Sequence, residues 1–358
     1  MNICELRVRQ FRNLEAVDMI PHGAMNIFYG DNAQGKTNLL ESLWLATGGK
    51  SFRGTKDSDL VRFGATQADI SVAFQAGGRR QCTDITIDTR RKASLNGIPL
   101  RAANRLMGVF CAVIFSPDHL SLIKDGPDAR RRFADAACCQ LRPLYMKVLA
   151  EYTRVLTQRN ALIKAVKKGE QPPDITLLDA YDERLCQSGL EVRRFRKEYI
   201  EELRPFAETI YTGLSSGREA LHLGYEMSEG EGNLPEAMKA ARATDLRAGF
   251  TTVGPHRDDV TVTIGGTSAR LFGSQGQQRS AVLALKLAEA SLLSKGYGEK
   301  PVILLDDVMS ELDQSRQEYI LNHIEGFQVF VTCCEPTAIS RLTGGQVFHM
   351  ENGRLTPA

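Results

Sequence analysis

The chain has 358 residues, of which 42% are hydrophobic and 25% are charged, as is typical of a globular protein with two or three domains. The net charge is only +2, so any nucleic-acid-binding surface would have to be a local basic patch. Eight cysteines without a C-x-x-C spacing argue against zinc or a disulfide framework and favour buried, reduced thiols. The N-terminus does not resemble a signal peptide, and no apolar run approaches the ~20 residues that cross a bilayer, so we expect a cytoplasmic protein.

The first predicted elements are a half-buried strand over 2–9, a turn at 11–14 and a buried strand over 25–29. Arg12 in the turn could contact a phosphate or stack on a base, and a solvated turn residue is an equal alternative.

The residues after the second strand fit the phosphate-binding pattern G-x-x-x-x-G-K-[ST]. They are Gly30, Asp31, Asn32, Ala33, Gln34, Gly35, Lys36 and Thr37. A predicted helix over 38–46 follows, and this strand–loop–helix order argues against a chance match in a Gly-rich turn. Glycines let backbone N–H groups face phosphate oxygens, and the helix N-terminus adds about half a positive charge. Lys36 can reach the β- and γ-phosphates, and the Thr37 hydroxyl can ligate Mg²⁺.

A mostly antiparallel region is predicted next. A basic bend at 50–54 contains Arg53, which could face phosphate or DNA. Strands are predicted over 69–75 and 81–88, followed by a hairpin around Asn96-Gly97 and a buried strand over 110–115. Ser116 or Asp118 can cap a short helix after that strand.

From 128 to about 168 the pattern is helical, and a second helical stripe runs from 178 to 206. Apolar residues recur at steps of three and four in both, with Arg159 interrupting the first stripe. The breaker Gly-Glu-Gln-Pro-Pro at 169–173 separates them. The pattern therefore predicts an antiparallel hairpin of two long helices, a short coiled-coil arm.

The first of these helices carries ten Lys and Arg residues against three acids. A basic stripe on a nearly neutral chain is suited to contact with a phosphate backbone, although a solvated helix face is an equal alternative. No base-reading helix is evident, so shape and charge would be recognised. The candidate DNA contacts are Arg53, Arg130, Arg131, Lys147 and Arg154.

A strand over 220–227 precedes a polar loop at 252–259, in which His256 has no partner at metal-ligand spacing. We expect His256 to form hydrogen bonds or face DNA. Ser274, Gln275 and Gly276 then lead towards a helix predicted over 280–294, which forms a second loop–helix junction able to hold an anion. One phosphate loop suffices for one subunit, so this junction is predicted to serve a nucleotide bound to another copy.

The strand predicted over 302–307 ends in two carboxylates at the sheet edge where ligands bind. Asp306 is placed to hold Mg²⁺, and Asp307 to orient or deprotonate an attacking water. A strand-to-helix cap is the alternative interpretation of the pair. A further buried strand is predicted over 328–332.

These motifs have the order and spacing of ABC-type ATPase heads, and the chain resembles, nearly end to end, the RecF family of bacterial recombination mediators related to SMC ATPases. The resemblance rests on the following segments: 11–14, 30–37, 115–118, 130–133, 254–259, 274–278 and 305–307. It implies an α/β fold, an ABC-type P-loop ATPase head with mixed sheets and an inserted antiparallel helical arm. The implied domains are 1–125 and 216–358 for the head and 126–215 for the arm.

The resemblance also implies that ATP and Mg²⁺ drive a homodimer. Ser274, Gln275 and Gly276 of one copy would contact the γ-phosphate held by Gly35, Lys36 and Thr37 of the other. DNA, as duplex, single strand or junction, would bind across the heads and arms. Family members act with RecO and RecR to load RecA in DNA repair, replication restart and the SOS response, with slow ATP hydrolysis resetting the dimer.

Two departures from transporter ATPases favour a weak, DNA-stimulated ATPase that acts as a switch. Asp307 replaces a longer Glu, and Thr332 and Cys333 stand where transporters place a histidine. A transporter subunit is the less favoured alternative because the basic arm is present and the histidine is missing. An SMC-like chromosome-organising ATPase is also less favoured, because it would need a long coiled coil.

Overall fold

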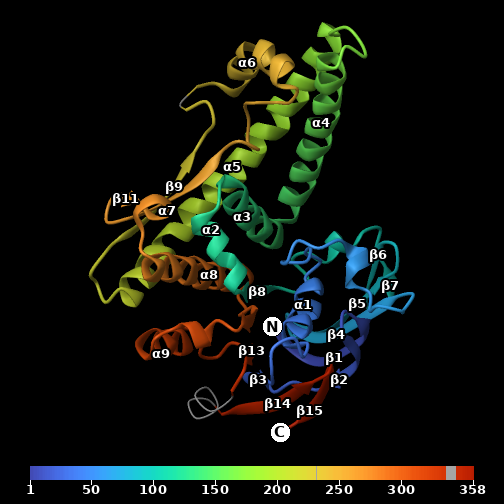
Figure 1. Cartoon of the computed structure of the whole chain (residues 1–358), viewed down its shortest axis with the longest axis vertical. Helices are drawn as coiled ribbons and strands as arrows, with labels where there is room; N and C mark the ends of the chain where they lie inside the picture. Colours follow the sequence, from blue (N-terminus) through green and yellow to red (C-terminus); the bar gives the residue numbers. More distant parts are fainter. Residues whose placement is uncertain (231, 336–343) are drawn as a thin grey trace. The chain divides into compact units, whose positions relative to one another are not determined.

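The computed structural model describes residues 1–230, 232–335 and 344–358. Contacts divide the chain into two compact units. Figure 1 colours the chain by residue number, from blue at the N-terminus to red at the C-terminus. Unit 1 joins the two chain ends, Met1–Leu120 and Leu283–Ala358, and unit 2 is the insertion Ser121–Val282. Unit 2 thus contains residues 216–282 as well as the segment predicted to form the arm.

Unit 1 contains two six-stranded sheets. The antiparallel sheet has the order β2-β1-β4-β5-β6-β7. Its strands are β1 (Asn2–Phe11), β2 (Leu14–Met19), β4 (Ala68–Ala76), β5 (Arg79–Ile87), β6 (Arg91–Leu95) and β7 (Ile98–Pro99). The predicted strands and the turn at Asn96-Gly97 are therefore confirmed, and both turn residues have positive φ, as a two-residue hairpin of this kind requires.

The other sheet has the order β15-β14-β3-β13-β12-β8 and is parallel except for its β14–β15 hairpin. Its strands are β3 (Met25–Tyr29), β8 (Ala112–Phe115), β12 (Val302–Asp306), β13 (Val329–Cys333), β14 (Gly345–Glu351) and β15 (Arg354–Pro357). The central strands are buried apolar runs, as expected of parallel strands covered on both faces.

One hydrophobic core joins the two sheets of unit 1. Helix α1 (Lys36–Leu45) contributes Leu39, Leu40 and Leu43 to it, all with no exposed surface. The same core contains apolar side chains from the antiparallel sheet and from β3, β12, β13 and β14. This packing fixes the N-terminus of α1 at the carboxyl ends of the parallel strands, where ligands of α/β sheets bind. Most of helix α8 (Gln275–Tyr297), helix α9 (Gln314–His323) and short 3-10 turns complete the unit.

Unit 2 is built on α4 (Pro143–Lys167) and α5 (Ile175–Leu214), which lie side by side in Figure 1. The predicted antiparallel helical pair is thus observed, but the first helix is broken. Pro143 starts α4 directly after α3 (Pro127–Leu141), because a proline favours the first turn and cannot continue the preceding helix. The remaining elements are α2 (Ser121–Lys124), β9 (Leu221–Glu226), α6 (Leu234–Ala248), β10 (Asp259–Ile264), β11 (Thr267–Ser268), α7 (Ala269–Phe272) and the start of α8 (Gln275–Tyr297).

Arg159 continues the buried stripe of α4 and does not interrupt it. Its side chain has no exposed surface and donates to Asp182 at 2.6 Å, to Asp245 at 2.7 Å and to Thr251 at 2.8 Å. Two carboxylates and a hydroxyl compensate the buried guanidinium, as a buried charge requires. No helix in the described part of the chain is both long and apolar enough to cross a membrane.

Candidate nucleotide-binding site

The phosphate-loop residues lie where the sequence places them, between β3 and α1. Gly30 and Gly35 have φ of 147° and 115°, and Ala33 has φ of 64°. A Cβ on Gly30 would collide with the Met350 carbonyl oxygen, and one on Gly35 would lie 2.8 Å from Asn13 Oδ1. Both positions therefore require glycine for backbone conformation and for space.

The start of α1 is open to an anion. Gly35 is its N-cap, and no side chain caps the first turn. The first N–H groups of a helix have no partner within the helix, so they are available to phosphate oxygens. Lys36 is buried, and its Nζ donates to the carbonyl oxygens of Gly30 at 2.5 Å and Asp31 at 2.8 Å. The ammonium group is thus held inside the curl of the loop.

Two turns form hydrogen bonds with the phosphate loop or the helix after it, and these contacts were not predicted from the sequence. Asn13, in the β1–β2 turn, donates to the Ala33 carbonyl oxygen at 3.2 Å and accepts from Asn38 at 2.8 Å. In the β14–β15 turn, the N–H groups of Asn352 and Gly353 donate to the side chain and backbone of Gln34 at 2.6 and 2.9 Å. The β14–β15 turn therefore helps to position the phosphate loop from a segment more than 300 residues away in the sequence.

Thr37 and Asp306 meet across the site. Thr37 Oγ1 donates to Asp306 Oδ1 at 2.8 Å, and Thr332 Oγ1 donates to the same oxygen at 3.0 Å. Asp306 is buried, and burial raises the pKa of its carboxyl group, against the two hydroxyl hydrogen bonds that lower it. A hydroxyl and a carboxylate beside a phosphate loop are the oxygen ligands that suit Mg²⁺. These residues fit the ion, which would neutralise phosphate charge when bound.

Asp307, which the sequence predicts to orient a water, directly follows β12. It has φ of 50°, its N–H donates to Thr332 Oγ1 at 2.9 Å, and its Oδ1 accepts from Ser310 at 2.9 Å. Thr332 on β13 therefore contacts the carboxylate of Asp306 and the backbone of Asp307. The partly exposed Asp307 side chain is directed by a strained backbone and one hydroxyl, a combination typical of functional sites.

Arg12 does not present a free guanidinium to a ligand. Its Nε and Nη2 each donate at 3.0 Å to the fully buried Glu41, and Nη2 also donates to Thr55 at 2.8 Å. Arg53 is exposed, donates to Asn38 at 3.0 Å and lies 3.9 Å from Glu41. Arg12 thus ties the β1–β2 turn to α1, whereas Arg53 stays accessible close to the phosphate loop.

The junction at Ser274 forms a capping box. Gln277 N–H donates to Ser274 Oγ at 3.2 Å, and Ser274 N–H donates to Gln277 Oε1 at 2.6 Å. The helix therefore begins at Gln275, earlier than the predicted 280, and Gln275 and Gly276 lie in its first turn. Because Ser274 Oγ accepts from Gln277, its hydroxyl hydrogen is free to donate to an anion.

The structure corrects the DNA-binding prediction for two arm residues. Arg130 is 6% exposed and donates to both carboxylate oxygens of Asp259, at 2.8 and 2.9 Å. Arg131 donates to the Asp258 carbonyl oxygen and to Asp128. These guanidinium groups hold the base of α3 to the start of β10, so they are not available to a phosphate backbone. Lys147 is exposed, and the exposed Arg154 pairs with Glu151 on its own helix.

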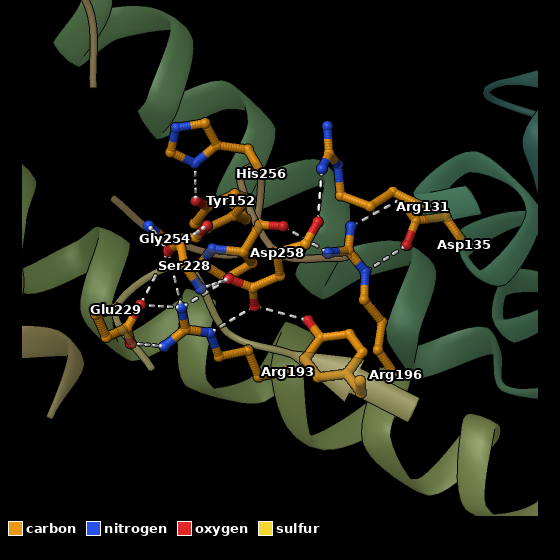
Figure 2. Close-up of polar contacts among 12 residues, drawn as sticks. Arg131, Asp135, Tyr152, Arg193, Arg196, Ser228, Glu229, Gly254, His256 and Asp258 are labelled. Carbon is orange, nitrogen blue, oxygen red and sulfur yellow. Dashed lines mark hydrogen bonds and ion pairs between the residues drawn. The ribbon is translucent and has the colours of Figure 1, made fainter. Parts of the chain in front are cut away.

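The loop at 252–259 faces inward, into a buried polar network at the base of the arm (Figure 2). Asp258 has no exposed surface and accepts from Arg193 Nε at 2.8 Å, Tyr225 at 2.7 Å and Ser228 N–H at 2.9 Å. Arg193 also pairs with Glu229. Alongside, Arg196 pairs with Asp135 and donates to the Pro255 carbonyl oxygen. The network links α3, α5, β9 and this loop.

His256 belongs to the same network, so it forms hydrogen bonds and does not face DNA. Its Nδ1 lies 2.6 Å from the Tyr152 hydroxyl, and its Nε2 lies 3.0 Å from the Thr251 carbonyl oxygen. Burial lowers the pKa of its imidazole from 6.5 to about 4. Within the described residues no group of three or more His, Cys, Asp or Glu side chains could hold a metal ion.

The lowered pKa of His256 predicts acid sensitivity. The unfolded chain binds a proton near pH 6.5 and the folded chain only near pH 4, so stability present above pH 6.5 is lost as pH falls through this window. The loss is at most about 3.4 kcal/mol, which is the difference between 6.5 and about 4 multiplied by 1.36 kcal/mol per pKa unit. Urea unfolding at pH 7 and 4.5 measures it, and His256→Gln should reduce the difference. An equal difference in wild type and variant would contradict this assignment.

The comparisons with known proteins agree with this fold. Residues 2–354 match the RecF/RecN/SMC N-terminal domain family. The Smc head domain of Pyrococcus furiosus superposes with a TM-score of 0.57 at 16% identity, covering 100% of this chain and 96% of that chain, which shows a shared fold. Two sheets, a phosphate loop and an inserted helical unit therefore define an ABC-type ATPase head of the SMC kind.

Relatives with higher sequence identity show the family within this class of ATPase heads. The DNA replication and repair protein RecF of Agathobacter rectalis is 39% identical over 99% of both chains, and that of Lachnospira eligens is 36% identical over the same share. A solved structure of the recombination mediator RecF with ATP superposes with a TM-score of 0.92 at 33% identity, covering 100% of this chain and 97% of that one. The chain belongs to the RecF family.

Proposed function

We propose that this chain is an ATP-dependent, DNA-binding recombination mediator whose two copies are joined by ATP and Mg²⁺. The contact between Thr37 and Asp306 carries the proposal, because a hydroxyl and a carboxylate of the kind that binds Mg²⁺ lie together beside the phosphate loop. The uncapped α1 and the buried Lys36 supply the phosphate contacts. The related RecF solved with ATP supports ATP as the nucleotide.

The second half of the nucleotide site would come from the partner copy. Ser274, Gln275 and Gly276 are exposed or half-buried. Directly before them, Leu271 and Phe272 are 71% and 74% exposed, and adjacent large apolar side chains of this kind favour a covered interface. Gln278 holds this segment by donating to the Ala269 carbonyl oxygen at 3.0 Å. These contacts fix the segment that carries Ser274, Gln275 and Gly276, here called the signature loop.

The proposed dimer works as a slow switch. Asp307 would orient the attacking water, and its short side chain favours slow, DNA-stimulated hydrolysis that releases the dimer. The solved structure of a related RecF is described as part of the RecFOR pathway, which supports RecO and RecR as partners. RecA loading at DNA gaps, with roles in replication and the SOS response, is the further part of this proposal and follows from the family resemblance. The cytoplasm is the compartment in which we propose that this occurs.

DNA binding with and without ATP tests the proposal in wild type, Lys36→Arg and Ser274→Arg. ATP and a non-hydrolysable analogue should both stimulate binding by the wild type. Both variants should lose this stimulation, while Ser274→Arg still binds ATP. Stimulation that survives Ser274→Arg would contradict a nucleotide shared between copies.

A further inference from the structure

One stretch of unit 1 is strongly basic although the chain is nearly neutral. Residues 89–106 contain five Lys and Arg residues and no Asp or Glu. They form β6, β7 and the following 3-10 turn at Ala103–Leu106, at the edge of the antiparallel sheet (Figure 1). The stretch therefore concentrates positive charge on one small element.

Arg91 brings a second basic segment to this stretch. Its side chain is only 9% exposed, donates to the Gly49 carbonyl oxygen and lies 3.4 Å from Asp57. Lys50 follows Gly49 and Lys56 precedes Asp57, so the contacts of Arg91 hold both lysines beside β6. The backbone beyond β7 returns along β6, because Leu100 N–H donates to the Ala93 carbonyl oxygen at 2.8 Å.

The resulting surface, here called the basic head patch, consists of Lys50, Lys56, Arg90, Lys92, Arg101 and Arg105. All six side chains are exposed. Across residues 1–230, 232–335 and 344–358, Lys92 has an acidic partner, Asp88 at 2.6 Å, and the other five have none. By contrast, seven of the ten cations on the predicted basic arm helix have acidic partners. The patch thus holds its charge available for a ligand.

We propose that the basic head patch binds the phosphate backbone of DNA. The inference rests on the proposed DNA-binding function and assigns it to a surface outside the arm. Exposed cations without acidic partners can neutralise DNA phosphates, and this releases the counterions that surround the DNA. The exposed amides of Asn96 and Asn104 add further phosphate donors. A protein partner would need an apolar interface core, and Ile98, 68% exposed, is the one large apolar side chain of this stretch that is exposed.

Ile98 has a distinct role in the proposed contact. It directly follows the turn at Asn96-Gly97 and pairs with Leu95 across the hairpin. An apolar side chain in this position suits contact with a sugar or base face. We expect Ile98→Ser to weaken DNA binding without changing its salt dependence, because no charge is removed.

The test is DNA binding by fluorescence anisotropy in ATP over a series of salt concentrations. The triple variant Arg90→Ala, Arg101→Ala, Arg105→Ala should bind more weakly, and the slope of log affinity against log salt should shrink by about 2 to 3. The matched control replaces Arg79, Lys239 and Lys295 by Ala, three exposed cations with no acidic partner in the described ranges. The control should keep the wild-type slope.

The outcomes separate this inference from the proposed function. Light scattering should show ATP-dependent dimers of the triple variant, and the single variant Arg101→Ala, with a slope smaller by about 1, serves if the triple variant fails to fold. A wild-type slope in the variants would overturn the inference while leaving ATP-dependent DNA binding intact. If the triple variant binds DNA as the wild type does but no longer binds poly-glutamate, the patch would serve an acidic protein. This result would also overturn the inference. Absence of DNA binding by the wild type would contradict the proposed function itself.

Discussion

Asp307→Asn is expected to lower ATP hydrolysis by about 100-fold or more, the scale of removing a general base. Asn keeps the shape of the side chain and tolerates the positive φ of 50° at this position, so the backbone should not change. The Thr37 and Asp306 contact is untouched. ATP binding and dimerisation should therefore persist, and the dimer should hold DNA for longer after ATP addition.

Single-turnover hydrolysis and light scattering measure the two properties separately. Ser310→Ala is the matched control, because it removes the hydroxyl that donates to Asp307 at 2.9 Å and leaves the carboxylate in place. Its rate should fall much less than that of Asp307→Asn. A rate for Asp307→Asn within about threefold of wild type would show that another group activates the water.

Asp258→Ala is expected to destabilise the protein by about 3 kcal/mol, at the lower end of the range for breaking a buried ion pair. The substitution removes the acceptor of Arg193, Tyr225 and Ser228 N–H at a position with no exposed surface. Arg193 keeps its pair with Glu229, which limits the loss. Urea unfolding followed by circular dichroism measures the change.

Asp179→Ala is the control for this prediction. Asp179 is largely exposed and accepts from Arg242 at 2.6 Å, so its removal should cost less than about 1 kcal/mol. Similar unfolding midpoints for the two variants would mean that the buried network at the base of the arm contributes little to stability.

The sequence predicted the elements whose signals are local. The strand at Met25–Tyr29 is observed with its predicted bounds, because a short apolar run before a Gly-rich loop specifies it. The turn at Asn96-Gly97 is specified by two residues that accept positive φ. The meeting of Thr37 with Asp306 could be predicted because both motifs end at the same edge of a parallel sheet.

The errors concern contacts between residues far apart in the chain. Arg130 and Arg159 look like surface cations on a helix, and their acidic partners Asp259 and Asp245 lie 129 and 86 residues away. No local pattern reveals such pairs, so charge counting overestimated the basic stripe. The support of Gln34 by the β14–β15 turn was missed for the same reason.

Mixing two inactive variants tests the shared nucleotide site most directly. Lys36→Ala removes the phosphate-loop lysine and Ser274→Arg blocks the signature loop, so each variant alone should neither hydrolyse ATP nor form the ATP-dependent dimer. In a mixed dimer, the phosphate loop of the Ser274→Arg copy would meet the signature loop of the Lys36→Ala copy and complete one site. Mixing should restore up to half of the wild-type hydrolysis. No recovery at any mixing ratio, with both variants folded, would contradict a nucleotide held between two copies.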